Sequence, residues 1–134
     1  GLDEAVAALR DPNLHTRRLA AESLGRIGSS KAIPPILEAL ADGTNDRVLD
    51  HALTYALIEI GDAKAAARGL SHQSPRVRRA CLAALSNIPD SGLEAKAVLA
   101  ELDAKDATLR ETAWWIASRH PQWGEQLADY FAQR

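Results

Sequence analysis

Apolar residues recur at helical spacing in four segments of the chain, and the four patterns superimpose. In the segment Val77–Ile88 the apolar positions are 77, 80, 81, 84, 85 and 88. This spacing of i, i+3, i+4, i+7, i+8 and i+11 places all six side chains on one face of an α-helix. The same six positions carry mainly apolar residues in Thr16–Ile27, Leu49–Ile60 and Leu109–His120.

The four segments are separated by repeat-sized distances. Their second residues lie 33, 28 and 32 residues apart, at positions 17, 50, 78 and 110. Small residues recur at one set of positions and Leu or Ile at another. Small residues let neighbouring helices approach closely, and the large ones fill the layer between them. We therefore expect an internal helical repeat.

A shorter helical pattern precedes each long one, at Leu2–Arg10, Ile33–Ala41, Lys64–Leu70 and Leu93–Leu102. Turn and N-cap sequences separate the patterns, at 11–13, 42–45 and 71–75. Gly28, Gly61 and Pro89 end the long helices at equivalent places. Pro34 and Pro35 fall in the first turn of their helix, where a missing N–H costs little.

These patterns predict an all-α fold, because a helix–turn–helix unit buries its apolar face only by stacking on its neighbours. We expect a right-handed α-solenoid of about four repeats plus a C-terminal helix. Residues 1–134 would form a single domain, with units at roughly 2–31, 32–63, 64–91 and 92–120 and a terminal helix at 121–133.

Composition favours the same fold and narrows the function. Ala and Leu dominate the apolar 46%, and only three Trp, two Tyr and one Phe are aromatic. No stretch has the roughly 20 apolar residues of a membrane span, and no signal peptide is evident. The net charge of −2 predicts no strong general attraction to nucleic acid or anionic lipid. The sequence has no Met, which favours a segment of a longer polypeptide.

Thr16–Gly28 resembles the signature of the short HEAT-like repeats first grouped with phycobilin lyases, in which an Arg-bearing helix ends in Leu-Gly-x-Ile-Gly. The strings at 78–81 and 110–113 match the same place, so the resemblance covers nearly the whole chain. It implies a helical-repeat fold and says little about function.

The resemblance also implies a ladder in which the helix arginine pairs with an acidic residue that closes the shorter helix. The candidate ladder residues are Asp11, Arg17, Asp42, Arg78, Asp103 and Arg110. In the second unit Asp50 replaces the arginine, so we expect an interruption there. Exposed pairs of this kind contribute only about 0–1 kcal/mol each, so their expected role is to fix the stacking angle.

A narrower resemblance concerns the strings at 47–60 and 118–123, which look like a bacterial subgroup of large exported proteins. In these proteins a sorbosone-dehydrogenase-like propeller precedes HEAT-like repeats and a cytochrome c domain. The resemblance would make the chain a spacer between redox domains, with a periplasmic or exported location; otherwise a cytoplasmic location is expected. The haem-attachment motif Cys-x-x-Cys-His is absent from this segment.

Histidine and cysteine offer no catalytic or metal-binding pattern. His15, His51, His72 and His120 lie in different units without ligand spacing, so surface or capping roles are expected. Cys81 occupies a small-residue position on its helix, which predicts a buried and inert thiol. We therefore expect no enzyme activity of the chain itself, no cofactor and no metal.

Two groups of residues could form an interaction surface. Arg18, Arg76 and Arg79, with the ladder arginines, could line a concave basic strip, or they could form ladder pairs and a solvated face. Trp114, Trp115 and Trp123 could pack on the last helix and cap the stack, or they could contact a neighbouring domain.

We therefore expect a non-catalytic scaffold for a protein partner, or a spacer between domains of the same chain. The alternative is a nucleic-acid-binding module that uses the arginine strip, but the isoelectric point near 6.1 is low for that class.

Overall fold

The computed structural model describes all residues 1–134 and contains helices but no strands, which confirms the all-α prediction. Three short 3-10 helices, η1 Ser30–Ala32, η2 Gly69–Ser71 and η3 Pro121–Trp123, accompany the α-helices. The nine α-helices are α1 Leu2–Ala8, α2 Leu14–Ile27, α3 Ile33–Ala41, α4 Arg47–Ile60, α5 Ala63–Arg68, α6 Pro75–Asn87, α7 Ala95–Leu99, α8 Ala107–Ser118 and α9 Gly124–Ala132.

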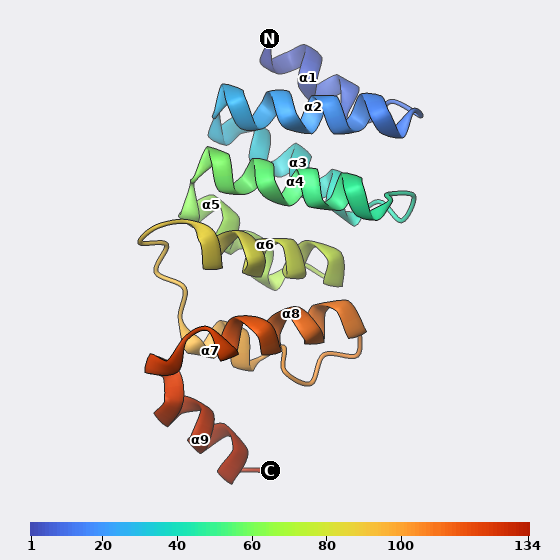
Figure 1. Ribbon diagram of the computed structural model, residues 1–134. Helices are drawn as coiled ribbons and strands as arrows, with labels where there is room; N and C mark the ends of the chain where they lie inside the picture. Colours follow the sequence, from blue (N-terminus) through green and yellow to red (C-terminus); the bar gives the residue numbers. More distant parts are fainter.

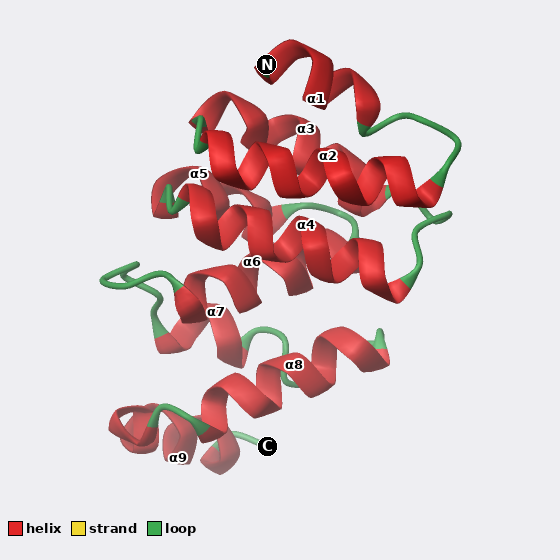
Figure 2. Cartoon of the chain, turned by 45° about the horizontal axis from the view of Figure 1, so that its top comes forward, coloured by secondary structure: helices red, strands yellow, loops and turns green.

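The helices stack into an elongated solenoid, as the sequence predicts. The four long helices α2, α4, α6 and α8 follow one another in one layer, and the shorter helices α1, α3, α5 and α7 lie behind them (Figure 1). The second view shows the same succession, with the two termini at opposite ends of the stack (Figure 2). Helix α9 lies beyond α8 and completes the end of the stack that contains the C-terminus.

The helix ends have the chemistry that their residues predict. Asn13, Asp46 and Asp106 are N-caps whose side chains accept hydrogen bonds from the backbone of the first turn. Gly28 and Gly61 end α2 and α4 in the left-handed conformation, with φ of 75° and 71°. Helix α6 ends differently, because the residue before Pro89 is extended, a conformation that proline imposes on its predecessor.

The interior is divided into two apolar clusters that meet at α6. The larger contains 19 buried residues from α1 to α6, and the smaller contains nine, centred on α7, α8 and Trp123. Helix α6 contributes to both, since Val77 and Cys81 face the first cluster and Leu82 the second. Leu70, in η2, packs against both clusters. The third long helix is therefore the joint between the two halves.

One part of the predicted apolar stripe is not buried. In α2, Leu19 and Ile27 are 46% and 45% exposed, whereas the equivalent Ala80 and Ile88 of α6 are buried. The difference arises because α6 lies inside the stack, whereas α2 lies at its end, where α1 covers only part of the face. These two side chains border a hollow of about 640 Å³ at this end of the solenoid.

The shorter helices are more irregular than their patterns predict. Helix α7 spans only Ala95–Leu99 of the expected Leu93–Leu102, and turns complete the segment. Helix α5 continues into η2. In η2, Gly69 is buried against α6, and a Cβ at this position would overlap the sulfur of Cys81. This close approach lets a very short unit still pack on its long helix.

We predict that Gly69→Ala destabilises the protein by about 1–3 kcal/mol, because the added methyl group overpacks the contact with Cys81. Chemical denaturation monitored by circular dichroism measures the effect. The control is Gly43→Ala, since a Cβ at Gly43 meets nothing within 4 Å. In the double variant Gly69→Ala/Cys81→Ala the two costs should partly cancel, and simple additivity would contradict this packing explanation.

Candidate functional site

A polar network centred on the buried Asn45 connects the first three units. The Arg17 guanidinium is only 7% exposed and donates hydrogen bonds to Thr44 Oγ1 at 3.1 Å and to Asn45 Oδ1 at 3.3 Å. Its Nη1 also lies 3.5 Å from Asp42 Oδ2. Arginine suits this role because its planar group offers several donors in fixed directions.

Asn45 also connects the network to the next unit. Its Nδ2 donates to Ala39 O at 2.6 Å and to Asp50 Oδ1 at 3.0 Å. The other oxygen of Asp50 accepts from Arg76 Nη1 at 3.2 Å. We call Arg17, Asp42, Thr44, Asn45, Asp50 and Arg76 the Asn45 network. Asp50, which was expected to interrupt the ladder, therefore forms an ion pair with Arg76. Here the acidic residue lies on the earlier long helix and the arginine on the next one.

The carboxylate of Asp42 is held in its charged form. Its pKa is lowered because the Thr44 backbone N–H and hydroxyl donate to it, and the Arg17 charge acts in the same direction. A depressed carboxylate pKa stabilises the fold above the unfolded-state pKa, and this contribution is lost as the pH falls through the folded-state value. The turn before α4 is therefore sensitive to acid.

The remaining ladder candidates have other partners. Arg78 Nε donates to Glu101 Oε2 at 2.7 Å, and Arg78 Nη1 donates to two backbone carbonyls. Arg110 donates to the backbone carbonyl of Ala104 at 2.8 Å. Asp103 accepts from Tyr130 and pairs with Arg134, and Asp11 accepts from the backbone N–H of Asn13. The structure thus pairs only Arg17 and Asp42 among the candidate residues.

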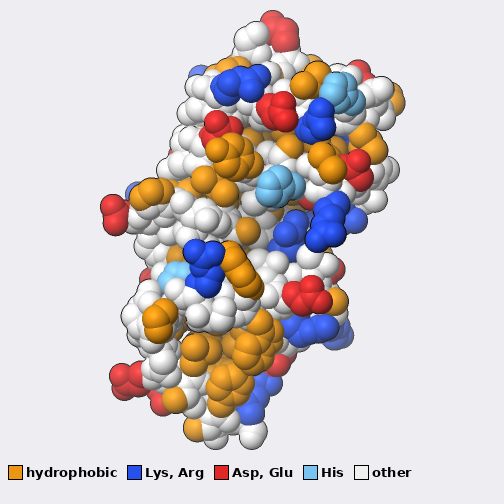
Figure 3. Space-filling view, in the orientation of Figure 1, with side chains coloured by type: hydrophobic (Ala, Val, Ile, Leu, Met, Phe, Trp, Pro, Cys, Tyr) orange, Lys and Arg blue, Asp and Glu red, His pale blue; other side chains and the backbone are white.

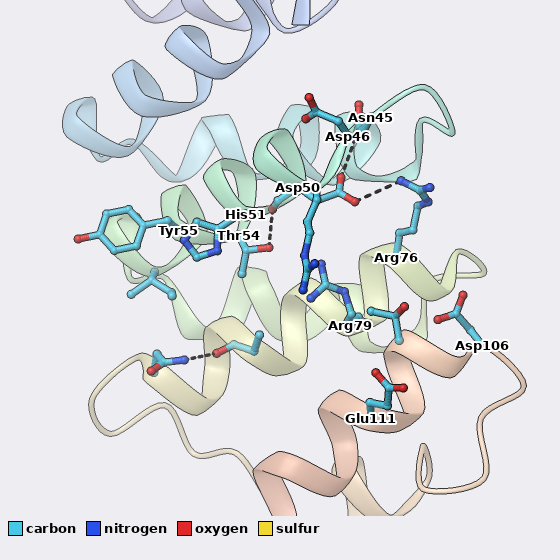
Figure 4. Close-up of a pocket in the computed structure, with 15 residues that line it drawn as sticks. Asn45, Asp46, Asp50, His51, Thr54, Tyr55, Arg76, Arg79, Asp106 and Glu111 are labelled. Carbon is cyan, nitrogen blue, oxygen red and sulfur yellow. Dashed lines mark hydrogen bonds and ion pairs between the residues drawn. The ribbon is translucent and has the colours of Figure 1, made fainter. Parts of the chain in front are cut away.

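Beside the network, α4, α6 and α8 enclose a hollow of about 750 Å³, which we call the central groove. Its polar lining shows in Figure 4, where Arg79 projects into the space between α4 and α6 while Asp106 and Glu111 lie on the α8 side. Figure 3 shows the same mixture of both charge signs on this face of the molecule. The lining residues from α4 and the turn before it are Asn45, Asp46, Arg47, Asp50, His51, Thr54, Tyr55 and Ile58; the others are Arg76, Arg79, Ala83, Asn87, Asp106, Thr108 and Glu111.

The predicted arginine strip is largely occupied by the protein's own groups. Arg17, Arg76, Arg78 and Arg110 have the partners described above, and Arg18 lies 3.9 Å from Glu22 and donates to His15 Nδ1. Among the arginines of the predicted strip, only Arg79 has no hydrogen bond or ion pair within the chain, and the groove residue Arg47, outside that strip, has none either. It is therefore the one predicted surface arginine whose charge is available to a ligand.

The histidines lie apart and make local contacts. His15 lies in the first turn of α2, and His72 accepts a hydrogen bond from the backbone N–H of Ser74. His120 lies 2.8 Å from Ile116 O through Nδ1, which must carry the proton because a carbonyl only accepts. Its ring stacks on Trp123 at 3.9 Å between centroids. No group of three His, Cys, Asp or Glu side chains is arranged to hold a metal ion.

The three tryptophans have different surroundings. Trp123 is buried in the smaller cluster. Trp114 stacks on Phe131 of α9 at 5.7 Å and donates to Leu102 O. Trp115 is 51% exposed, and the Arg119 guanidinium lies over its ring, 4.5 Å from the centroid. Two tryptophans thus pack at the end of the stack, and the third presents its ring to the surface.

Cys81 is fully buried, and burial raises the pKa of its thiol to about 12. No helix has the length and apolar character needed to cross a bilayer.

The fold and the comparisons agree on the class of the molecule, an α-solenoid of helical repeats. Residues 1–58 match the family model of HEAT repeats, and this match supports a HEAT-like repeat architecture. No curated protein matches the chain significantly. The matched part covers the first unit and most of the second, and it ends within the last turn of α4. The likeness to phycobilin-lyase-type repeats and to exported redox proteins has no support from these comparisons and stays a prediction.

Asn45 was not among the functional residues predicted from the sequence. We predict that Asn45→Ala lowers the free energy of unfolding by about 1–3 kcal/mol, because it leaves buried polar partners unsatisfied. The matched control is Asn87→Ala, since Asn87 is exposed and bonds only a carbonyl of its own helix. Urea denaturation compares the two. If Asn45→Ala is as stable as the parent protein, the network does not contribute to stability as predicted.

We also predict that Cys81 does not react with iodoacetamide in the native protein at pH 8, because almost no thiolate forms when the pKa is near 12. In denaturant the thiol should react at the rate of a model peptide. Mass spectrometry of the alkylated fraction measures both rates. Rapid modification of the folded protein would show that the thiol is exposed by frequent opening of α6.

Proposed function

We propose that the chain is a non-catalytic protein-interaction scaffold that binds its partner in the central groove. The observation that carries the proposal is the presence, in one hollow, of an uncommitted Arg79 and a Tyr55 that is 55% exposed. Arginine and tyrosine dominate the binding energy of protein interfaces, because both combine large contact area with hydrogen bonding. HEAT repeats generally mediate protein interactions, and the match over residues 1–58 supports this class of function.

The charge balance of the groove favours a protein over a nucleic acid. Three arginines, Arg47, Arg76 and Arg79, face four carboxylates, those of Asp46, Asp50, Asp106 and Glu111. Arg76 is already paired with Asp50. A surface that binds a phosphate backbone carries a clear excess of positive charge, and this groove has none. The nucleic-acid alternative is therefore the weaker proposal.

The same scaffold could connect domains of one polypeptide, as the narrower family resemblance implies. Exposed apolar side chains at both ends of the stack, Leu19 and Ile27 on α2 and Phe131 on α9, are consistent with contacts to neighbouring domains. This spacer role, in a larger dehydrogenase or cytochrome c-type protein, is a second form of the proposal.

The proposal is tested by site-specific photocrosslinking, with benzoylphenylalanine in place of Tyr55 in the full chain. In extract from the source cells we expect ultraviolet light to produce a discrete adduct with another protein, because position 55 would contact the partner directly. Mass spectrometry of the adduct then identifies the partner and the crosslinked peptide.

The matched control places the same photoreactive residue at Lys64, an exposed position on α5 away from the groove. Adducts of equal yield and composition at both positions would contradict binding in the groove. A shift of labelled duplex DNA that weakens steeply with salt would favour the nucleic-acid alternative.

A further inference from the structure

Some charged residues of the central groove are already used by the chain itself. Asp50 accepts hydrogen bonds from Asn45 Nδ2 at 3.0 Å and from Arg76 Nη1 at 3.2 Å. Asp46 caps α4, because its Oδ1 accepts from the backbone N–H of Leu49 at 2.8 Å. These groups stabilise the turn before α4 and the contact between α4 and α6, so a ligand that engaged them would compete with the fold.

Other charged groups of the lining are free to meet a ligand. Arg47, Arg79 and Glu111 have no hydrogen bond or ion pair within the chain. Asp106 is half committed, because its Oδ1 accepts from the backbone N–H of Leu109 at 2.9 Å while Oδ2 has no partner. The groove therefore offers two guanidinium groups and two carboxylates without loss of an existing side-chain contact.

The free groups of opposite sign lie on different sides of the groove. Arg47 begins α4 and Arg79 projects between α4 and α6, whereas Asp106 and Glu111 lie on the α8 side (Figure 4). The change of sign follows one position of the repeat. His51, Arg79 and Glu111 are separated by 28 and 32 residues, as the repeated segments are, so this position changes from basic to acidic between α6 and α8. No ion pair joins Arg79 to Glu111.

This separation of charge disfavours a ligand of a single sign. A purely acidic segment is attracted by Arg47 and Arg79 but repelled by Asp106 and Glu111, and a purely basic segment meets the reverse. Like charges that are brought together at an interface cost free energy, whereas complementary charges favour one partner over another. A segment with one acidic and one basic side chain gains on both sides of the groove.

Tyr55 adds a contact that does not depend on charge. Its side chain is 55% exposed on α4, and it lines the groove with His51 one turn before it and Ile58 one turn after it. Exposed tyrosines of this kind supply much of the binding energy at protein interfaces. The charged groups around it then determine which segment binds, since electrostatic complementarity contributes more to specificity than to affinity.

Resting on the function proposed above, we infer that the central groove binds a protein segment that carries both charge signs. An acidic side chain of the segment pairs with Arg79 or Arg47, whose planar donors suit a carboxylate. A basic side chain pairs with Glu111 or Asp106 on the α8 side. The part of the segment between the two charges contacts the ring of Tyr55.

The test begins with a random dodecapeptide library displayed on phage and selected on the full chain at low salt. We expect the enriched peptides to contain both Asp or Glu and Lys or Arg. The affinity of a synthetic enriched peptide is then measured by fluorescence anisotropy. It should fall about three- to tenfold in Arg79→Gln and also in Glu111→Gln, because each variant removes one partially exposed charge pair.

Double-mutant cycles between protein and peptide assign each pair. Replacement of the acidic peptide residue by Ala should weaken binding to the parent protein but cause little further loss in Arg79→Gln. Replacement of the basic peptide residue should show the same coupling with Glu111→Gln. General damage to the fold would weaken all peptides alike and would show no such coupling.

The control is Lys64→Gln, which removes a positive charge outside the groove and should leave the affinity unchanged. Circular dichroism checks that each variant keeps its helix content. Enriched peptides of a single charge sign, a rise of affinity in Glu111→Gln, or the absence of coupling at either residue overturns the inference. If such peptides still lose affinity in Tyr55→Ala, the groove remains a protein-binding site.

If no enriched peptide responds to Tyr55→Ala, Arg79→Gln or Glu111→Gln, the inference and the proposed function both fail. Displacement of the peptide by a DNA duplex at moderate salt overturns the inference in favour of a phosphate ligand, since a duplex competes only where phosphates bind.

Discussion

The close approach of successive helices depends on small side chains at their contacts, and the rest of the solenoid depends on that approach. Gly25 of α2 faces the backbone of Ala56 in α4, and a Cβ at Gly25 would lie only 3.3 Å from the Ala56 Cα. At Gly69 of η2, a Cβ would overlap the sulfur of Cys81 in α6. Because each unit is too small to bury an apolar face alone, its stability comes from the neighbouring unit, and the small residues determine how near that neighbour lies.

Polar contacts add to this packing and connect specific residues of neighbouring units. The Asn45 network joins the first three units, and each of its charged members has an oppositely charged partner within the chain. Together with the contacts of Arg78 and Arg110, it occupies most of the arginines of the predicted strip. The groove therefore offers a ligand the exposed ring of Tyr55, the charges of Arg47 and Arg79, and the carboxylates of Asp106 and Glu111.

The fold was predictable from the sequence to a greater degree than the site. The long helices follow from a pattern of six mainly apolar positions on one helix face that recurs in all four units. Gly28 and Gly61 end the first two of these helices as expected. The exposure of Leu19 and Ile27 was not predictable, because the stripe is the same in an end unit as in an inner one. Periodicity describes the helix and carries no information about what covers it.

The polar contacts were harder to foresee for a different physical reason. Asp50 seemed to interrupt the ladder, but a residue in the next unit, Arg76, supplies its partner. Asn45 resembled an ordinary turn residue, although its amide joins three partners from different parts of the chain. The central groove likewise combines residues from three units. Such contacts arise only when the stacking geometry is known, whereas caps and stripes are local.

The division of the interior into two apolar clusters has a mechanical consequence. Helix α4 belongs to the larger cluster, α8 belongs to the smaller one, and α6 is shared, so the groove spans the seam between them. A ligand that contacts all three helices links the two clusters across this seam. By linkage, a ligand that binds this arrangement of the three helices more tightly than a bent one opposes bending of one half against the other at α6.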